Sequence, residues 1–442
     1  MRLVQWFSLP AAILAYCCTG AFGESGSYLP ISYAAPEPAA AASGPAVDDE
    51  CYPARTKSAT CDAGCSSSRA CSDCGSGCGS GSLCLFPCRC TGDPWTLQSY
   101  LNDESSCYRY GGWVSAGGYV NAHGADNNGP IGFREVGDEF TVDQVWGFFE
   151  RRANTGGYGW DWGFRSDFVF GVDGPDTQAF FSHPNAYDNS WDASGYYGSA
   201  LPQLYAELAV NNLSVKMGHF FTILGYERVP VIDNFFYSHS YCHAFGEPYT
   251  HTGVLAEYAW NDLTFWGGWT QGWDTGFDNY LGMNTFLGGI RAPLTDAITL
   301  TWALNAGDFG ARDGDIYMQS VIADVLLTNK LTYVFQTDWG GNSGGAVVNQ
   351  WYGINNYLLY TINPCWATGL RFEWYHDDDG THLLEAGDYY AVTCGVNWKP
   401  RPNVRFRPEL RYDWYRGAGA LPFDAGQEDE QLSGGFDLIV TF

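Results

Sequence analysis

The sequence has few charged side chains, and basic ones are especially scarce. Asp, Glu, Lys and Arg make up 16% of the 442 residues, whereas soluble domains average roughly 25%. Lys and Arg number 22 against 49 Asp and Glu, which gives a formal charge of −27. This acidic balance argues against a nucleic-acid partner, because binding phosphates requires a basic surface.

A long apolar run is also missing beyond the first residues. Arg2, the apolar stretch from Leu3 to Tyr16 and the small-residue site at 21–23 predict a signal peptide over 1–23. A lipoprotein signal at Cys17 or Cys18 is an alternative that the bulky Tyr16 disfavours. After this segment, no run of 18 apolar residues predicts a transmembrane helix. If the mature protein lies in a membrane, it must cross it as a closed β-barrel.

Two segments precede the main part of the chain. Residues 24–50 are rich in Ala, Pro and Ser, which is typical of a flexible linker. Residues 51–107 are rich in Cys, and in an exported protein this pattern favours disulfides. A zinc site is the alternative, but only Cys71 and Cys74 have the C-x-x-C spacing. The disulfide candidates are Cys51, Cys61, Cys65, Cys71, Cys74, Cys78, Cys84, Cys88, Cys90 and Cys107.

From about residue 108 the chain alternates between apolar and polar side chains, the period of a β-strand. Aromatic residues reach 17% and glycines number 55, which suits strands with an aromatic, lipid-facing surface. Sixteen segments show the pattern: near 112–121, 143–153, 160–171, 203–210, 213–223, 253–260, 263–270, 285–292, 297–305, 318–327, 331–338, 350–361, 366–375, 388–398, 403–415 and 433–442.

The connections between these segments alternate between short and long. Two- to four-residue turns with Asn, Asp or Pro, such as 211–212 and 261–262, are followed by long connections such as 224–252. Outer-membrane barrels have this order, with short periplasmic turns and long external loops. The sequence therefore predicts an all-β fold, a single antiparallel transmembrane β-barrel of 14–16 strands over 108–442.

The final residues support the same architecture. In GGFDLIVTF, the side chains of Phe436, Leu438, Val440 and Phe442 lie on one face of a strand that ends with the chain. A closed barrel pairs its last strand with its first. Outer-membrane proteins commonly end in such a strand with a terminal Phe. We therefore interpret these four residues as the assembly signal for the barrel-insertion machinery.

One region of the chain resembles a known family. The segments GHFFTILGYE (218–227), FYSHSY (236–241), EPYTHTG (247–253) and GWTQGWD (268–274) are similar to the OmpL-like β-barrel porins common in planctomycete bacteria. The resemblance covers about 95–442. It implies an outer-membrane barrel with a porin-like role, and it supplies no catalytic residues.

Charged residues in the predicted strands are expected to face the lumen, because Arg at mid-depth on the lipid face costs about 2–4 kcal/mol. We hypothesise a constriction with arginines on one wall and acids of the inward-folded third external loop opposite, which would create a transverse field. The alternative is that the charges form lumenal ion pairs that only rigidify the barrel. The pore-lining candidates are Arg165, Lys216, Arg371, Arg405, Arg407, Arg411, Glu227, Asp233 and Glu247.

Three other motifs resemble catalytic or metal-binding sites but are better explained without such a role. Ser343 in GNSGG lacks an evident His and Asp partner for nucleophilic catalysis. His239 and His243 have metal-ligand spacing only on a helix, whereas here a loop is expected. The acidic stretch 376–380 lacks the ligand spacing of a calcium loop. We therefore assign no catalytic, metal or cofactor site.

The sequence thus predicts an outer-membrane porin, a passive channel for ions and small hydrophilic solutes. Its expected partners are outer-membrane lipid, the barrel-insertion machinery and, by analogy with sixteen-stranded porins, two further copies of itself in a homotrimer. A closed structural or adhesive barrel is the first alternative, and an outer-membrane barrel hydrolase is the second.

Overall fold

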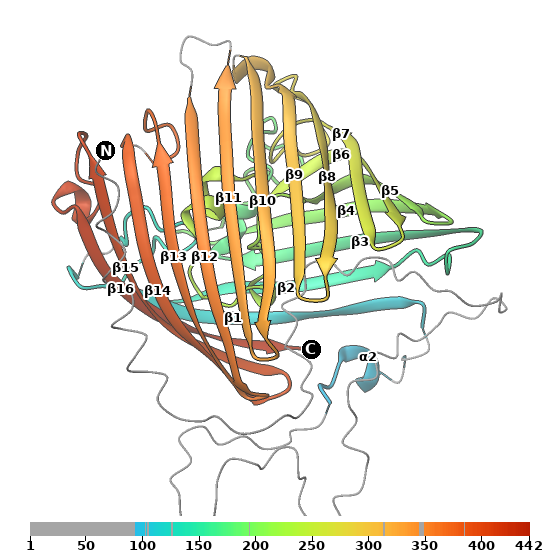
Figure 1. Cartoon of the computed structure of the whole chain (residues 1–442), viewed down its shortest axis with the longest axis horizontal. Helices are drawn as coiled ribbons and strands as arrows, with labels where there is room; N and C mark the ends of the chain where they lie inside the picture. The colour runs from blue at the N-terminus through green and yellow to red at the C-terminus, as the bar shows by residue number, and fades with distance from the viewer. Residues whose placement is uncertain are drawn as a thin grey trace, which may run out of the picture.

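A closed β-barrel makes up the part of the chain that the structure describes. The computed structural model describes residues 93–442 except 102, 104–105, 125–126, 194, 313, 344–348 and 384. Within this part, sixteen antiparallel strands each pair with their neighbours in sequence, and β16 pairs with β1 (Figure 1). The predicted barrel is confirmed. The predictions for 1–23, for 24–50 and for the cysteines from Cys51 to Cys90 lie outside the described residues.

The strands are β1 Tyr108–Asn121, β2 Phe140–Arg151, β3 Trp160–Gly171, β4 Gly198–Val210, β5 Leu213–Phe221, β6 Thr250–Trp260, β7 Leu263–Thr270, β8 Asn284–Thr295, β9 Ile298–Asp308, β10 Asp315–Thr328, β11 Leu331–Ser343, β12 Gln350–Asn363, β13 Trp366–Asp377, β14 Gly387–Arg401, β15 Val404–Gly417 and β16 Glu430–Thr441. The short helices are α2 Leu97–Tyr100, α3 Asp173–Thr177, η1 Val231–Asp233, η2 Cys242–Gly246, η3 Gly310–Arg312 and η4 Asp424–Gly426. Among the described residues, no helix has the length and apolarity needed to cross a bilayer.

Two strand boundaries differ notably from the sequence prediction. β4 begins at Gly198 rather than near 203, because pairing with β3 extends it through a Gly- and Pro-containing stretch that reads locally as a loop. β11 continues through Ser343 rather than ending near 338, so Gly341 and Ser343 belong to a strand and not to a loop. In both places partner strands supply the backbone hydrogen bonds that local propensity does not predict.

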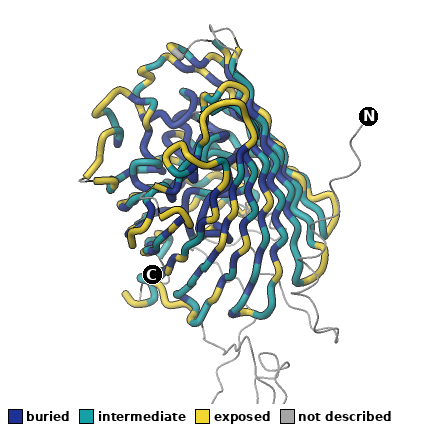
Figure 2. Tube along the Cα trace, turned by 90° about the vertical axis from the view of Figure 1, so that its left-hand side faces the viewer, coloured by how far each residue is buried: buried dark blue, intermediate teal, exposed yellow. Residues whose placement is uncertain are grey.

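The two faces of the barrel wall have different chemistry. On β15, Leu410 and Tyr412 on the outer face are 51% and 38% exposed, whereas Arg407 and Arg411 on the inner face are each 1% exposed. Figure 2 shows the same alternation of buried and exposed residues along many strands. An apolar, aromatic outer surface around a charged interior is the arrangement of a transmembrane barrel, with lipid outside.

The last residue closes the barrel. The Phe442 N–H donates to the Gly112 carbonyl at 2.9 Å, and the Gly112 N–H donates to the Phe442 carbonyl at 3.0 Å. From there the β1–β16 register runs from Trp113 opposite Thr441 to Asn121 opposite Ser433. A Cβ on Gly111 would lie 2.6 Å from the Phe442 carbonyl oxygen, so the backbones at this seam approach too closely for a side chain.

The loop between β5 and β6, residues 222–249 and here called L3, folds into the barrel (Figure 1). Every residue from Phe235 to His243 is buried. L3 contains η1 and η2 and packs against the inner faces of strands far away in sequence. It therefore determines what space remains in the lumen.

Candidate functional site in the barrel lumen

Arginines on the inner face of β15 hold the first half of L3 by its backbone. Arg405 donates to the Ile232 carbonyl at 3.0 Å. Arg407 donates to the carbonyls of Asn234 at 2.9 Å and Phe236 at 2.8 Å. Charge-assisted hydrogen bonds of this kind are about twice as strong as neutral ones. The periodic arginines thus bind successive carbonyls of one inserted loop.

Two further arginines hold the middle of L3. Arg411 on β15 donates to the His239 carbonyl at 2.7 Å. Arg371 on β13 donates to the carbonyls of Ser238 at 2.7 Å and His239 at 3.2 Å. A backbone segment without its own secondary structure needs external partners when it is buried. The wall supplies them in order along the loop.

Acidic residues neutralise these buried arginines. The ion pairs, given by nitrogen–oxygen distance, are Arg407–Asp437 (2.7 Å), Arg371–Glu227 (2.8 Å), Arg371–Glu373 (2.8 Å) and Arg411–Asp413 (2.8 Å). Of these acids only Glu227 belongs to L3, and the others belong to the wall. Breaking one such buried pair by removing a partner typically costs about 3–5 kcal/mol.

Wall carboxylates also accept hydrogen bonds from L3 amides. Glu409 of β15 accepts from the Tyr237 N–H at 2.7 Å and from the Ser238 N–H at 3.0 Å. Glu373 of β13 accepts from the Tyr241 N–H at 2.8 Å. Both the carbonyl and the amide groups of L3 are therefore bound by charged side chains of the wall.

The opposite edge of L3 contacts β2, β11 and β12. Gln144 of β2 donates to the Val229 carbonyl at 2.8 Å. Gln336 of β11 donates to the Glu247 carboxylate, and Trp351 of β12 donates to the Gly246 carbonyl at 3.0 Å. L3 is thus anchored on both sides and spans the lumen.

Glycines on the inner face make room for L3 side chains. A Cβ on Gly353 of β12 would lie 2.1 Å from the Cys242 Sγ, and one on Gly369 of β13 would lie 2.6 Å from the Phe235 ring. These two glycines were not among the predicted site residues. Their signal was present, since each occupies an inward position of an alternating strand where a side chain is otherwise expected.

The structure separates the nine predicted pore-lining residues into groups. Arg371, Arg405, Arg407, Arg411 and Glu227 meet at the contact between L3 and the wall. Glu247 lies at the other edge of L3, and Asp233 is exposed. Arg165 is ion-paired with Glu150 at 2.8 Å and with Asp167 at 2.6 Å, and Lys216 lies over the Tyr205 ring.

This arrangement differs from the constriction hypothesised above. There, loop acids faced the arginines across an open lumen, whereas Glu227 is in direct contact with Arg371. The difference arises because sequence periodicity gives the face on which a charge lies but not its partner. In the structure these arginines bind the loop itself.

A second set of lumenal charges is half-buried and was not among the predicted residues. Glu207 on β4, Glu257 on β6, Arg291 on β8 and Asp324 on β10 all occupy inward positions. Asp324 interacts electrostatically with Arg291 and with Arg228 of L3. Together with Lys216, these side chains give the β4–β10 side of the lumen a mixed-charge surface.

An apolar cluster fills the lumen nearer the long loops. It joins Leu224 and Tyr241 of L3 to Trp273 of the β7–β8 loop and to wall residues such as Met318 and Trp351. The general expectation for a porin lumen is polar. The external half of this lumen therefore has a packed, largely aromatic core on the side of β6–β15.

Two buried histidines stack within L3. The rings of His239 and His243 are 4.5 Å apart, and His239 Nδ1 lies 3.1 Å from Glu227. Burial lowers the pKa of His239 to about 3 and that of His243 to about 4. Burial alone would raise the pKa of Glu227, but the Arg371 guanidinium holds it well below its usual range. Burial raises the pKa of Glu247 to about 7.

We expect acid to weaken the docking of L3. In a released L3 the histidines would take up protons near their ordinary pKa of 6.5, whereas in the docked loop they stay neutral to a lower pH. Their contribution to the free energy of docking is therefore complete above pH 6.5 and is lost as the pH falls toward 4. Glu227 acts in the same sense below its ordinary 4.5. Glu247 acts oppositely, since its contribution is lost as the pH rises through 7. A difference of one pKa unit corresponds to about 1.4 kcal/mol. The two histidines together therefore dominate the pH dependence of L3 docking.

The measurement is single-channel conductance, which should increase between pH 7 and pH 4. His243→Phe retains the ring stacking and should reduce this increase. His123→Phe, a substitution at an exposed loop position, is the matched control and should leave it unchanged. An equal acid response in both variants would contradict the role of the buried histidines.

The described cysteines fall into two groups. Cys107, directly before β1, and Cys365, in the β12–β13 turn, are each disulfide-bonded. Cys242, buried in L3, carries a free thiol, and Cys394 lies on β14. Within the described residues, no group of three or more His, Cys, Asp or Glu has an arrangement that could hold a metal ion.

A closed barrel with an apolar outer face, a charged lumen and an inserted third loop defines the protein as an outer-membrane porin barrel. A family profile described as "Putative beta-barrel porin-2, OmpL-like" matches residues 108–442, the complete barrel. The chain belongs to this family. The segments that carried the resemblance lie in L3 or directly beside it.

Solved structures share the fold at low sequence identity. The outer membrane channel DcaP of Acinetobacter baumannii has a TM-score of 0.52 and 13% identity, covering 76% of this chain and 97% of that one. An anion-selective porin from Comamonas acidovorans has a TM-score of 0.51 and 11% identity, covering 76% and 99%. A search of curated protein sequences found no match.

Proposed function

We propose that the protein is a passive diffusion channel for ions and small hydrophilic solutes in the outer membrane. The observation that carries this proposal is the closed barrel of a porin family with ionisable groups along its inner wall. The names of two structurally similar proteins, a channel and an anion-selective porin, support the same class of activity.

We infer that solutes pass along the β4–β10 side of the lumen. Arg371, Arg407 and Arg411 on β13 and β15 are fully buried and bind L3. The other set, by contrast, is only half-buried: Lys216, Glu257, Arg291 and Asp324. Half-buried side chains of both signs can exchange hydrogen bonds with a hydrated solute. The transverse field of our initial hypothesis would then act between these wall residues and Arg228 of L3.

The channel is expected to prefer cations. The lumenal arginines that would attract anions are neutralised by Asp437, Glu373 and Asp413, while the chain as a whole carries a charge of −27. The test is the reversal potential of the purified protein in a planar bilayer under a KCl gradient. A reversal potential of the anion-selective sign would contradict the expected preference for cations. In the same recordings, a homotrimer would give conductance steps in sets of three.

A closed barrel with a structural or adhesive role is the second candidate, and the packed lumen favours it. L3 and the aromatic cluster fill much of the interior. The same bilayer experiment separates the two functions. Protein that is folded and inserted but gives no conductance steps at any pH from 4 to 8 would exclude the porin and leave the closed barrel.

We further propose that residues 1–23 direct export and that the insertion machinery reads β16 together with Phe442, which directly follows it. The alternating outer face of this strand, with Phe436 and Leu438 each 43% exposed, supports such recognition. A homotrimer remains a prediction based on other sixteen-stranded porins. β5 and β7, with nine and eight residues, are the shortest strands of the barrel.

A further inference from the structure

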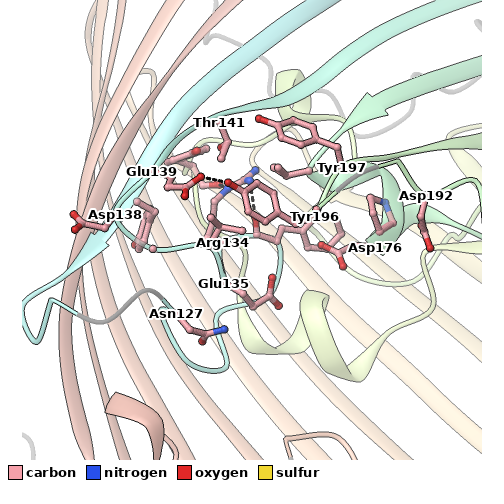
Figure 3. Close-up of a pocket in the computed structure, with 18 residues that line it drawn as sticks. Asn127, Arg134, Glu135, Asp138, Glu139, Thr141, Asp176, Asp192, Tyr196 and Tyr197 are labelled. Carbon is pink, nitrogen blue, oxygen red and sulfur yellow. Dashed lines mark hydrogen bonds between the residues drawn. The ribbon is translucent and has the colours of Figure 1, made fainter.

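We propose that the cavity at the external end of the barrel is a binding site for small organic cations, which this porin would concentrate at its entrance. The cavity has a volume of about 740 Å³ (Figure 3). Most of its lining comes from the β1–β2 loop, between Asn127 and Glu139, and from the β3–β4 loop, and Tyr237 of L3 also contributes. Ligand pockets for small molecules have volumes of about 300–1,000 Å³.

The charge of the lining is strongly one-sided. Its carboxylates are Glu135, Asp138, Glu139, Asp176 and Asp192. In the described part of the chain, none of them forms an ion pair with a basic side chain. Arg134 is the only basic residue among the lining residues, and it is 3% exposed. Its guanidinium donates to both Asp173 oxygens, at 2.9 and 3.2 Å, and is therefore already neutralised.

Aromatic rings supply the other half of a cation site. Tyr196 and Tyr197 extend from the β3–β4 loop into the cavity, with ring centroids 5.4 Å apart. The Tyr196 hydroxyl donates to Glu139, and Tyr197 stacks on Phe170 at 5.9 Å, so both rings are held in place. Aromatic faces attract ammonium and guanidinium groups, and carboxylates beside them add full charges. This combination favours a cation with an organic body over a bare metal ion.

Two carboxylates of the lining, Glu135 and Asp176, lie close enough for Glu135 to repel the charge on Asp176. They come from different loops, and Figure 3 shows both side chains on one side of the cavity below Tyr196. Burial, with repulsion from Glu135, raises the pKa of Asp176 to about 8, and burial raises that of Glu135 to about 7. Arg134 opposes both shifts, and Asp173 adds to that of Glu135. A bound cation would stabilise both ionised carboxylates, so affinity should fall as the pH drops from above about 8, the pKa of Asp176, to below about 7, the pKa of Glu135.

This inference rests on the proposed channel, because the cavity would serve as its external entrance. Binding can nevertheless be measured without transport. The experiment is isothermal titration of detergent-folded protein with choline, in comparison with 3,3-dimethyl-1-butanol, its uncharged analogue. The variant is the double substitution Glu135→Gln and Asp176→Asn. Asp262→Asn, in the exposed β6–β7 turn at the other end of the barrel, is the matched control.

We expect saturable choline binding that weakens about tenfold or more in the double variant, because the attraction of two carboxylates for the ammonium group is lost. Binding should be unchanged in Asp262→Asn. The uncharged analogue should bind at least about tenfold more weakly than choline. Tyr196→Leu should also weaken binding while leaving the carboxylates in place. Heat-modifiable mobility on gels would verify that each variant is folded.

Three results would overturn the proposal: no saturable binding, equal binding of choline and its analogue, or an unchanged affinity in the double variant. Binding by protein that gives no conductance would overturn the channel and leave the cation site. Conductance by protein that does not bind choline would overturn the cation site and leave the channel. The two proposals therefore fail separately.

Discussion

Replacing Arg371 with alanine is expected to release the middle of L3 and to raise single-channel conductance severalfold. Arg371 is fully buried and binds two L3 carbonyls and the Glu227 carboxylate. Its removal leaves Glu227 buried without its arginine and leaves Glu373 with only Arg411, at 3.4 Å. Removing one partner of such a buried pair typically costs about 3–5 kcal/mol. That penalty is avoided if L3 leaves the wall and its carboxylate becomes hydrated. The barrel hydrogen bonds are untouched, so the strands should remain folded.

The measurement is bilayer conductance together with the melting of the folded band on gels. Arg416→Ala is the matched control, because Arg416 is exposed and pairs with an exposed Asp429, where little energy is expected. Gly369→Leu tests the same docking without removing a charge, since its side chain would collide with the Phe235 ring. Gly267→Leu, at an outward position with 3.9 Å to the nearest atom, is its control. Unchanged conductance in both Arg371→Ala and Gly369→Leu would exclude L3 as the element that narrows the lumen.

Removing residues 433–442 is expected to abolish the folded barrel. This segment supplies nearly all of the β16 residues that pair with β1 on one side and most of those that pair with β15 on the other. Without it, two strand edges would present unpaired amide and carbonyl groups in lipid, where each costs several kcal/mol. No heat-modifiable band should form, either in cells or on refolding in detergent. Deleting 418–421 from the exposed β15–β16 loop is the control and should preserve the band. A normal band from the truncated chain would contradict the observed closure.

Phe442→Ala distinguishes recognition from stability. The substitution retains the two backbone hydrogen bonds with Gly112, and one side chain at the end of a strand contributes little to the stability of the whole barrel. We therefore expect a large loss of assembled protein in cells and a near-normal yield on refolding in detergent. Equal losses in both settings would mean that Phe442 acts through stability and not as an assembly signal.

The barrel was predictable because strand periodicity is a local property. The two-residue alternation on β13 and β15, and the short turns at 211–212 and 261–262, each lie within a few neighbouring residues. Errors occurred where pairing overrides local composition, as at Gly198 in β4 and Gly341 in β11. There the hydrogen bonds come from a neighbouring strand whose register a single segment does not reveal.

The interior was predictable only in part. The alternation of side chains placed Arg407 and Arg411 on the inner face of β15. Alternation specifies only the face of the strand on which a side chain lies. It could not show that their partners include Phe236 and His239, whose carbonyls are about 170 residues away in sequence. Nor could it distinguish an arginine that faces water from one that binds a loop, since both occupy the same inward position.

Four features could be derived from the amino-acid sequence: the alternating strands, the order of short and long connections, the terminal closing strand and the membership of a porin family. Each depends on residues that lie close together in the chain. The filling of the lumen, in contrast, became visible only in the folded barrel. The docking of L3, its arginine-bound carbonyls and the acidic external cavity each depend on groups from strands and loops that meet only after the barrel has closed. Long-range contacts of this kind leave no periodic trace in one sequence, and they are what set the size and charge of the remaining passage.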